Sequence, residues 1–250
     1  KVVINELMIA PGHVPDSTGE WIELYNAGDP NDPLGMIDLE GWTITTSLGE
    51  SHTLTYLNAV GGQVGMTFFP EQYMVIARSA DNAVNGGFSP DYAYGADISL
   101  PDPFEIGSHT TVTITLRDAE GELVDQVTYD TAAWGDKIQD GRTTSLVHTY
   151  TDNSGAEYWE ASGGNLDPML NVKYGEVGKK LFGSPKSAND MERSVPHSGC
   201  VVPDGAHSCA FAACAPDLRC DFPLTEGCCE ADGDCNDWDS CTNDTCDTFN

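Results

Sequence analysis

The chain has 250 residues, 40% of them hydrophobic, which is enough apolar material for one large or two small folded domains. Its 40 acidic residues against 11 basic ones give a formal net charge of −29, which repels nucleic-acid phosphates and anionic membrane surfaces. Nucleic acid is therefore a poor candidate as a direct partner, whereas divalent cations and basic protein surfaces are favoured. Plain solubility in an extracellular or salty medium explains the same charge.

The first two strands are expected near the N-terminus. Residues 2–9 form an apolar run interrupted by Asn5 and Glu6, and the stretch from Gly19 to Asn26 alternates in the manner of a strand. One side of that strand carries Glu20, Ile22 and Leu24, and the other carries Trp21, Glu23 and Tyr25. Both strands thus place carboxylates where a core disfavours them.

Later stretches continue the strand pattern. Residues 41–45 and 52–55 alternate, and the nearly continuous apolar run 72–77 predicts a central strand buried on both faces. Residues 111–116 lead through Gly121 into 123–129, which predicts a β-hairpin with Val112, Ile114 and Leu116 facing inward.

The remaining sequence is less regular. Residues 144–147 are expected to form a closing strand, Trp159 to plug one end of the core, and residues 152–186 to form a long irregular return. Convincing helical periodicity is absent. The fold class predicted from these elements is an all-β sandwich.

Several short motifs, in their order along the chain, carry a resemblance to a known family. They are Ile4-Asn5-Glu6, Glu20 to Asn26, Ile37 to Trp42, Tyr73 to Ala77, the hairpin from Thr111 to Tyr129, Gly141 to Leu146, Trp159 and Gly183-Ser184-Pro185 running to Asn189. Residues 1–190 resemble the bacterial lamin-tail domain. The resemblance implies an immunoglobulin-like β-sandwich that serves as an accessory or adhesive module without a catalytic residue set. Residues 191–199 are then a linker, and residues 200–250 a small, disulfide-rich acidic segment.

Residues 200–250 hold every cysteine of the chain. The nine are Cys200, Cys209, Cys214, Cys220, Cys228, Cys229, Cys235, Cys241 and Cys246. Dense cysteines in a short acidic segment indicate disulfides formed outside the reducing cytosol, and they favour bridges over zinc binding. We therefore expect an extracellular or cell-surface protein whose signal peptide has been removed, since residue 1 is Lys1. No run approaches the roughly 20 apolar residues that a membrane helix needs, so no membrane insertion is expected.

The cysteine pattern from Cys220 to Cys246 resembles the Cys-rich, Asp-rich repeats of proteobacterial surface proteins. Such repeats normally continue to a further cysteine, and the odd number of cysteines fits a continuation beyond Asn250, a bond to another chain or one free thiol.

An acidic run within this segment is a candidate calcium site. Its oxygen-bearing residues are Asp232, Asp234, Asn236, Asp237 and Asp239. Oxygen ligands at alternate positions suit calcium, which takes six to eight hard oxygens. The run starts like an EF-hand loop, but Asp237 stands where that loop needs glycine, so it is no EF-hand. A solvated acidic turn is the alternative.

The acids of the first two strands leave a second question open. Glu6, Glu20 and Glu23, with Asn5 and Asn26, could form another cation site. Alternatively, Glu6 and Glu23 accept backbone hydrogen bonds or pair with basic residues, because an unpaired buried carboxylate is costly.

Catalytic motifs are not found. The six histidines are scattered, and no HExxH or GxSxG pattern occurs. Trp134, Tyr92 and Tyr94 are candidates for glycan binding or for core packing. The predicted function is a secreted structural or adhesive module, not an enzyme, which is stabilised by calcium and binds a protein surface or other copies of itself. Self-assembly into an extracellular fibre is the runner-up within this class. The alternative is an accessory domain of, or part of, a secreted hydrolase acting on nucleic acid or glycan.

Overall fold

The computed structural model describes ten segments of the chain. They are residues 2–12, 14–31, 35–61, 66–104, 110–147, 153–162, 173–174, 181–189, 213–214 and 220–221. Two compact units are present, Lys1–Arg193 and Ser194–Asn250. The linker predicted at residues 191–199 lies outside the described residues.

The larger sheet of the first unit has eight strands. In the order β13-β14-β11-β1-β2-β7-β8, neighbours are hydrogen-bonded, and β12 also pairs with β11. The strands are β1 (Val2–Ala10), β2 (Trp21–Asn26), β7 (Tyr73–Ala77), β8 (Tyr92–Ala93), β11 (Arg142–Leu146), β12 (Trp159–Ala161), β13 (Lys173–Tyr174) and β14 (Leu181–Phe182). The pairs β11–β14 and β7–β8 are parallel, and the other pairs are antiparallel.

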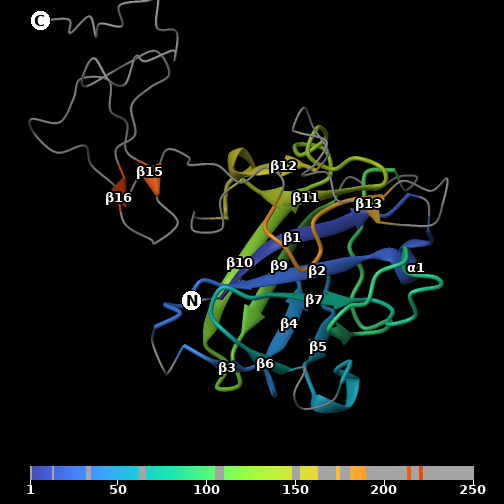
Figure 1. Ribbon diagram of the computed structural model, residues 1–250. Coiled ribbons are helices and arrows are strands. Elements are labelled where there is room, and N and C mark those ends of the chain that lie inside the picture. Colours follow the sequence, from blue (N-terminus) through green and yellow to red (C-terminus); the bar gives the residue numbers. More distant parts are fainter. Residues whose placement is uncertain are drawn as a thin grey trace, which may run out of the picture. The chain divides into compact units, whose positions relative to one another are not determined.

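The smaller sheet has the order β10-β9-β4-β5 and packs against one face of the larger one. Its strands are β4 (Thr43–Thr46), β5 (Ser51–Thr53), β9 (Thr111–Arg117) and β10 (Leu123–Asp130). In Figure 1 the strands β1, β2 and β7 run across the direction of β4 and β9. A short ribbon of β3 (Ile37–Asp38) and β6 (Thr67–Phe68) lies beside the sheets.

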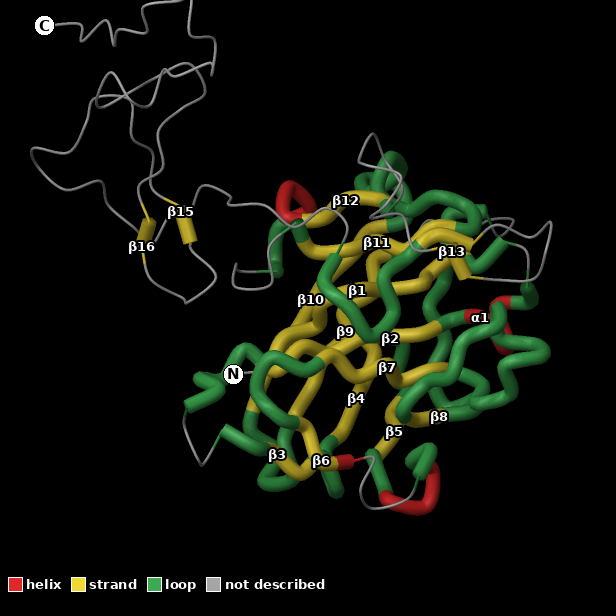
Figure 2. The backbone as a smooth tube through the Cα atoms, viewed as in Figure 1, coloured by secondary structure: helices red, strands yellow, loops and turns green. Residues whose placement is uncertain are grey.

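Helical structure is minor among the described residues, as Figure 2 makes clear. In this part of the chain there is one α-helical turn, α1 (Asp16–Gly19), and 3-10 turns occupy Tyr56–Asn58 and Ala156–Tyr158. In the second unit β15 (Ala213–Cys214) pairs with β16 (Cys220–Asp221). The all-β, immunoglobulin-like sandwich is confirmed for the first unit.

The main core lies between the two sheets and is built by period-two alternation. Ile22 and Leu24 of β2 meet Val112, Ile114 and Leu116 of β9, all of them at most 1% exposed. Burying one such side chain contributes roughly 1.5–3 kcal/mol. The predicted inward residues of the hairpin are therefore confirmed.

The outer face of the larger sheet is buried as well. Val75 of β7 packs with Met8, Trp21 and Leu181, while its neighbour Ile76 faces the main core. A strand covered on both faces explains the continuous apolar run at residues 72–77, and β7 does lie inside the sheet, between β2 and β8.

Three aromatic residues that were candidates for glycan binding are core residues. Trp134, Tyr92 and Tyr94 are 4%, 0% and 2% exposed, so the packing alternative is correct for them. Trp159 lies on β12 with its ring 5.7 Å from that of Trp134, and its indole N–H donates to the Asn153 carbonyl over 2.9 Å. Trp159 thus fills the core as expected, but β12 and β14 give more regular structure to residues 152–186 than the sequence suggested.

Candidate functional site

A β-bulge in β1 places two neighbouring polar side chains on the outer face of the larger sheet. The register with β2 shifts between Ile4, which is opposite Leu24, and Glu6, which is opposite Glu23. One extra residue in a strand changes the phase of alternation, so Ile4 and Leu7 both point into the main core. Asn5 and Glu6 point away from it together.

The Glu6 carboxylate is fully buried and is surrounded by hydrogen-bond donors. The Thr143 hydroxyl donates to it, as does the Ser145 hydroxyl over 3.0 Å, both from the neighbouring strand β11. Ser184 contributes its backbone N–H at 3.0 Å and its hydroxyl at 3.1 Å. The Ser162 hydroxyl completes the group at 3.4 Å. These contacts offset much of the cost of burying the carboxylate.

Glu23 lies opposite Glu6 on β2 and is also fully buried. Its Oε1 accepts a hydrogen bond from the Asn5 amide over 2.9 Å. Its Oε2 accepts one from the backbone N–H of Lys186 over 2.6 Å. Both oxygens of Glu23 are therefore bound by the chain itself.

Residues 181–189, here called the strap, cover this face of the sheet. Besides Ser184 and Lys186, the strap supplies Asn189, whose amide donates to the Asn5 side-chain oxygen and to the Leu146 carbonyl, each over 2.8 Å. Gly183 lies so close to Thr143 that a Cβ at this position would stand 2.6 Å from its Cγ2. Polar contacts thus hold the strap to β1, β2 and β11. At Gly183 the strap lies so close to β11 that a larger side chain would not fit.

Burial dominates the electrostatics of the two acids. Desolvation raises the pKa of Glu6 above its ordinary value of 4.5, although the hydrogen bonds from Thr143 and Ser184 act to lower it. Desolvation, followed by the charge of Glu6, raises the pKa of Glu23 well above 4.5. Protonation of at least one of the two carboxylates is favoured, because two negative charges that face each other in a buried place repel.

The other acid of β2 lies in a separate place. Glu20 forms an ion pair with Arg78, its Oε2 lying 2.6 Å from Nη1, and the two side chains are 4% and 16% exposed. Burial raises the pKa of Glu20 to about 7 against the opposing effect of Arg78. Glu20 is therefore held by an ion pair and lies apart from Glu6 and Glu23.

Asn26 does not join the acids either. Its amide donates to the carbonyls of Gly35 and Phe68, both over 3.0 Å, and its side-chain oxygen accepts the Gly28 N–H over 3.0 Å. Asn26 thus organises turns at the end of β2, and the five residues considered together in the sequence divide into three places.

Among the histidines, His52 is the one within the described residues, and its position is structural. Its ring nitrogens lie 2.7 Å from an Asp97 oxygen and 2.8 Å from the Tyr92 hydroxyl, which also accepts the Thr55 N–H over 3.1 Å. These contacts connect β5 of the smaller sheet to β8 of the larger one.

The cluster of Glu6, Glu23 and Asn5 under the strap is therefore a hydrogen-bonded network that stabilises the fold. Sequence reasoning identified its acids but missed their partners Thr143, Ser145 and Ser184. The signal that could have found two of them is the spacing of Thr143 and Ser145, which puts both hydroxyls on one face of a strand. In the part of the chain that the structure describes, no three His, Cys, Asp or Glu side chains are grouped to hold a metal ion.

The predicted calcium residues, Asp232, Asp234, Asn236, Asp237 and Asp239, lie outside the described residues. So do seven of the nine cysteines. The other two, Cys214 and Cys220, are directly opposite each other in the β15–β16 ladder. The calcium site and the disulfides stay predictions.

The first unit is thus an immunoglobulin-like β-sandwich. Glu6 and Glu23, on the outer face of its larger sheet, are enclosed by the strap. The model of the lamin tail domain matches residues 1–131, which is more than half of the chain. The protein therefore belongs to the lamin tail domain family. Comparisons with curated proteins and with solved structures found no match. No helix among the described residues is both long and apolar enough to cross a membrane.

Proposed function

We propose that this protein is a secreted or cell-surface module with a structural or adhesive role and no catalytic activity, stabilised by calcium bound to its acidic cysteine-rich segment. The observation that carries the proposal is the enclosure of Glu6 and Glu23, whose oxygens face donors of the chain itself. General acid–base catalysis needs a carboxyl group within hydrogen-bond reach of a substrate. Enclosed acids of this kind serve the fold instead, which agrees with a structural module.

Secretion is supported by the confinement of all nine cysteines to residues 200–246. The corresponding measurement is the intact mass of the secreted chain before and after reduction. A mass increase on reduction is the expected result. Nine free thiols in the mature protein would contradict the proposal.

Calcium binding is tested by thermal unfolding of the full chain with calcium or with a chelator. We expect calcium to raise the unfolding midpoint, because a ligand that binds the folded state alone stabilises it. The double variant Asp232→Asn/Asp234→Asn is expected to lose this increase. Its matched control is Glu120→Gln/Glu122→Gln, which removes two exposed charges from the β9–β10 turn. An equal unfolding midpoint in calcium and in chelator would contradict the calcium proposal.

The partners we propose are a protein surface or further copies of this chain. Strand β10 ends the strand order of the smaller sheet, and Leu123 at its start is 55% exposed. An edge strand can pair with a strand of another molecule. Assembly through β10 into extracellular fibres is the form of self-association that these features support.

Assembly is measured by light scattering and negative-stain microscopy over a range of protein concentrations. Fibres that form with the unchanged chain and are lost in Leu123→Lys are the expected result. The control is Leu48→Lys, at a residue 46% exposed that lies outside β10. Monomers at every concentration would contradict assembly. Hydrolysis of nucleic acid or glycan by the purified chain would contradict the non-catalytic role.

A further inference from the structure

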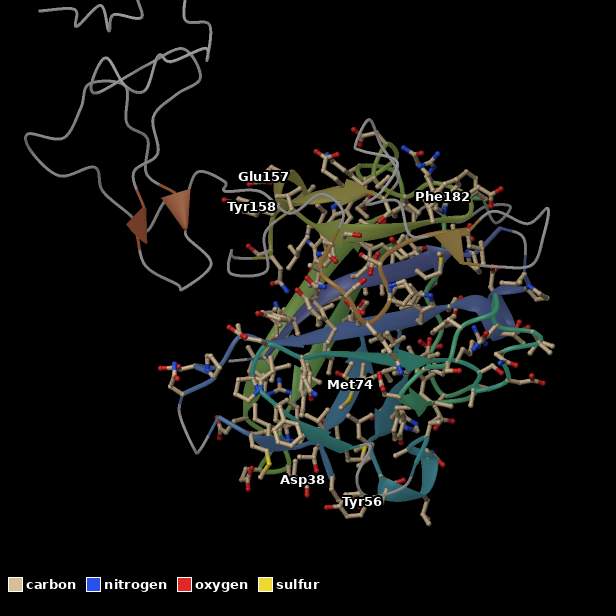
Figure 3. All side chains as sticks on the ribbon, in the orientation of Figure 1. Asp38, Tyr56, Met74, Glu157, Tyr158 and Phe182 are labelled. Atoms are coloured by element: carbon tan, nitrogen blue, oxygen red, sulfur yellow. The ribbon has the colours of Figure 1, made fainter. Side chains whose placement is uncertain are left out.

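A groove of about 490 Å³ lies between the turn that joins β6 to β7 and the strap. Its lining includes Phe69, Glu71, Gln72, Tyr73, Asp91 and Lys186. We call it the β6–β7 groove. Its volume falls within the range of about 300–1,000 Å³ that is typical of small-ligand sites. Met74, which also lines it, is labelled on β7 in Figure 3.

Both non-glycine residues that adopt a positive φ in the described part of the chain line this groove. Glu71 has φ 61° and Lys186 has φ 66°. A positive φ is unfavourable for residues other than Gly, Asn or Asp. It persists in a folded protein only where the surrounding structure imposes it. Two strained residues from segments more than a hundred positions apart thus meet at one groove, which points to a function for their side chains.

The strain at Glu71 is imposed by a β-turn. The Gln72 N–H donates to the Phe69 carbonyl over 3.2 Å, which closes a turn with Pro70 second and Glu71 third. The third residue of such a turn has a positive φ, so this position is usually occupied by glycine. The Glu71 N–H donates to the Asn26 carbonyl over 2.7 Å and anchors the turn to the end of β2.

The lining combines aromatic rings with polar groups. Phe69 is 47% exposed, and the Tyr73 ring lies 4.6 Å from that of Tyr25, which supports it from behind. The Glu71 and Gln72 side chains are exposed beside these rings.

An ion pair completes the polar side of the groove. Lys186 Nζ lies 2.8 Å from Asp91 Oδ1, and Asp91 Oδ2 accepts the Val75 N–H over 2.9 Å. Asp91 is thereby fixed in place. The groove offers donors and acceptors on one side and aromatic carbon on the other.

We propose that the β6–β7 groove binds a neutral carbohydrate. A sugar ring has a C–H face that packs against an aromatic ring, and its hydroxyls both donate to carboxylates and accept from an ammonium or amide. An anionic ligand is disfavoured by Glu71, Asp91 and the net charge of −29. A purely apolar ligand would desolvate the carboxylates of Glu71 and Asp91 without offering them hydrogen-bond donors in place of water. The inference rests on the adhesive half of the proposed function and is independent of calcium binding and of assembly.

The test is isothermal titration of the full chain with neutral tetrasaccharides of cellulose, chitin, mannan and xylan, and with an acidic tetragalacturonate. Saturable binding of at least one neutral sugar is expected. Phe69→Ala should weaken it on the order of tenfold or more, because the aromatic contact is lost. Phe104→Ala is the matched control, since Phe104 is 56% exposed and does not line the groove.

A second variant separates binding from folding. Glu71→Gly relieves the positive φ, so the unfolding midpoint should stay equal or rise while sugar affinity falls. Binding of no neutral sugar, binding of the acidic sugar alone, or unchanged affinity in Phe69→Ala and Glu71→Gly would each overturn the inference. Calcium-dependent stabilisation and assembly are measured on the same samples, so a failure of sugar binding alone leaves the proposed function intact.

Discussion

Glu6 and Glu23 face each other across β1 and β2, and both carboxylates are fully buried on the outer face of the larger sheet. Their hydrogen-bond donors come from β1, β11, the residue after β12 and the strap, up to 178 positions away in the sequence. Because each acid raises the cost of ionising the other, the pair couples the stability of the sandwich to its protonation.

The first prediction concerns pH. Glu6 and Glu23 have folded pKa values raised above 4.5, so the folded state binds more protons than the unfolded state above that pH. The contribution of these two acids to stability is therefore fully present below about pH 4.5 and is lost as pH rises through their folded pKa values. Glu23→Gln removes the titrating charge, so the stability of this variant relative to the unchanged chain should rise between pH 4.5 and pH 8 in denaturant unfolding. Its amide N–H2 meets one of the two N–H donors that bind Glu23, which lowers stability by an amount that does not vary with pH.

General charge repulsion also weakens the fold as pH rises, so a control is needed. Glu122→Gln removes the same charge from an exposed position and corrects for that effect. If Glu23→Gln and Glu122→Gln show the same pH profile, the buried pair does not govern the pH dependence.

The second prediction concerns the contact between the strap and β11. Gly183 has no positive φ, so alanine suits its backbone, but the new Cβ would stand 2.6 Å from Thr143 Cγ2. Gly183→Ala should therefore destabilise the fold by about 1–3 kcal/mol, as overpacking does. Thr143→Ser removes Cγ2 and keeps the hydroxyl that binds Glu6.

A double-mutant cycle checks this contact. Combining Thr143→Ser with Gly183→Ala should restore part of the loss, giving a favourable coupling energy in chemical denaturation. Strict additivity of the two single variants would show that Gly183 and Thr143 are not in contact.

The strands of the sandwich were predictable where local periodicity decides them. Ile22 and Leu24, and the hairpin with Val112 and Ile114, alternate without interruption, so their inward faces follow from the sequence. The bulge at Asn5 and Glu6 was not predicted, although the change of phase between Ile4 and Leu7 marks it. Prediction from local pattern takes the inward–outward alternation of a strand as uninterrupted, whereas a bulge shifts that alternation by one residue.

The candidate site was predictable only in its acids. Glu6 and Glu23 stand out because carboxylates interrupt apolar strands, but nothing local to them indicates Ser184 or Lys186. Their proximity depends on the parallel pairing of β14 with β11, which is a long-range contact. The β6–β7 groove depends on the strap in the same way.

The third prediction concerns the ion pair of Glu20 and Arg78. At pH 8 the Glu20 carboxylate is ionised, since its pKa is about 7, and Arg78→Gln would leave its charge buried without a basic partner. A loss of about 3 kcal/mol is expected at pH 8, the size usual for breaking a buried pair. At pH 5 Glu20 is mostly protonated, so the loss should be smaller. Arg117→Gln, at an exposed arginine, should show no such difference between the two pH values in urea unfolding.

The fourth prediction concerns the extent of the folding unit. The family match ends at residue 131, yet β11 beyond it pairs with β1 in the middle of the larger sheet. Trp134, Ile138, Leu146 and Trp159 also belong to the main core, at most 4% exposed. Losing one buried tryptophan alone costs about 3–5 kcal/mol.

A chain ending at residue 131 would therefore lose four core side chains, one neighbour of β1 and the hydroxyls that bind Glu6. Because total stability is about 5–15 kcal/mol for a typical domain, this shortened chain should not unfold cooperatively. A chain ending at residue 193, the limit of the first compact unit, should retain a sharp thermal transition. Calorimetry of both chains decides the matter. A cooperative transition of similar midpoint in the shorter chain would mean that β11 and the strap are additions to a core that is complete without them.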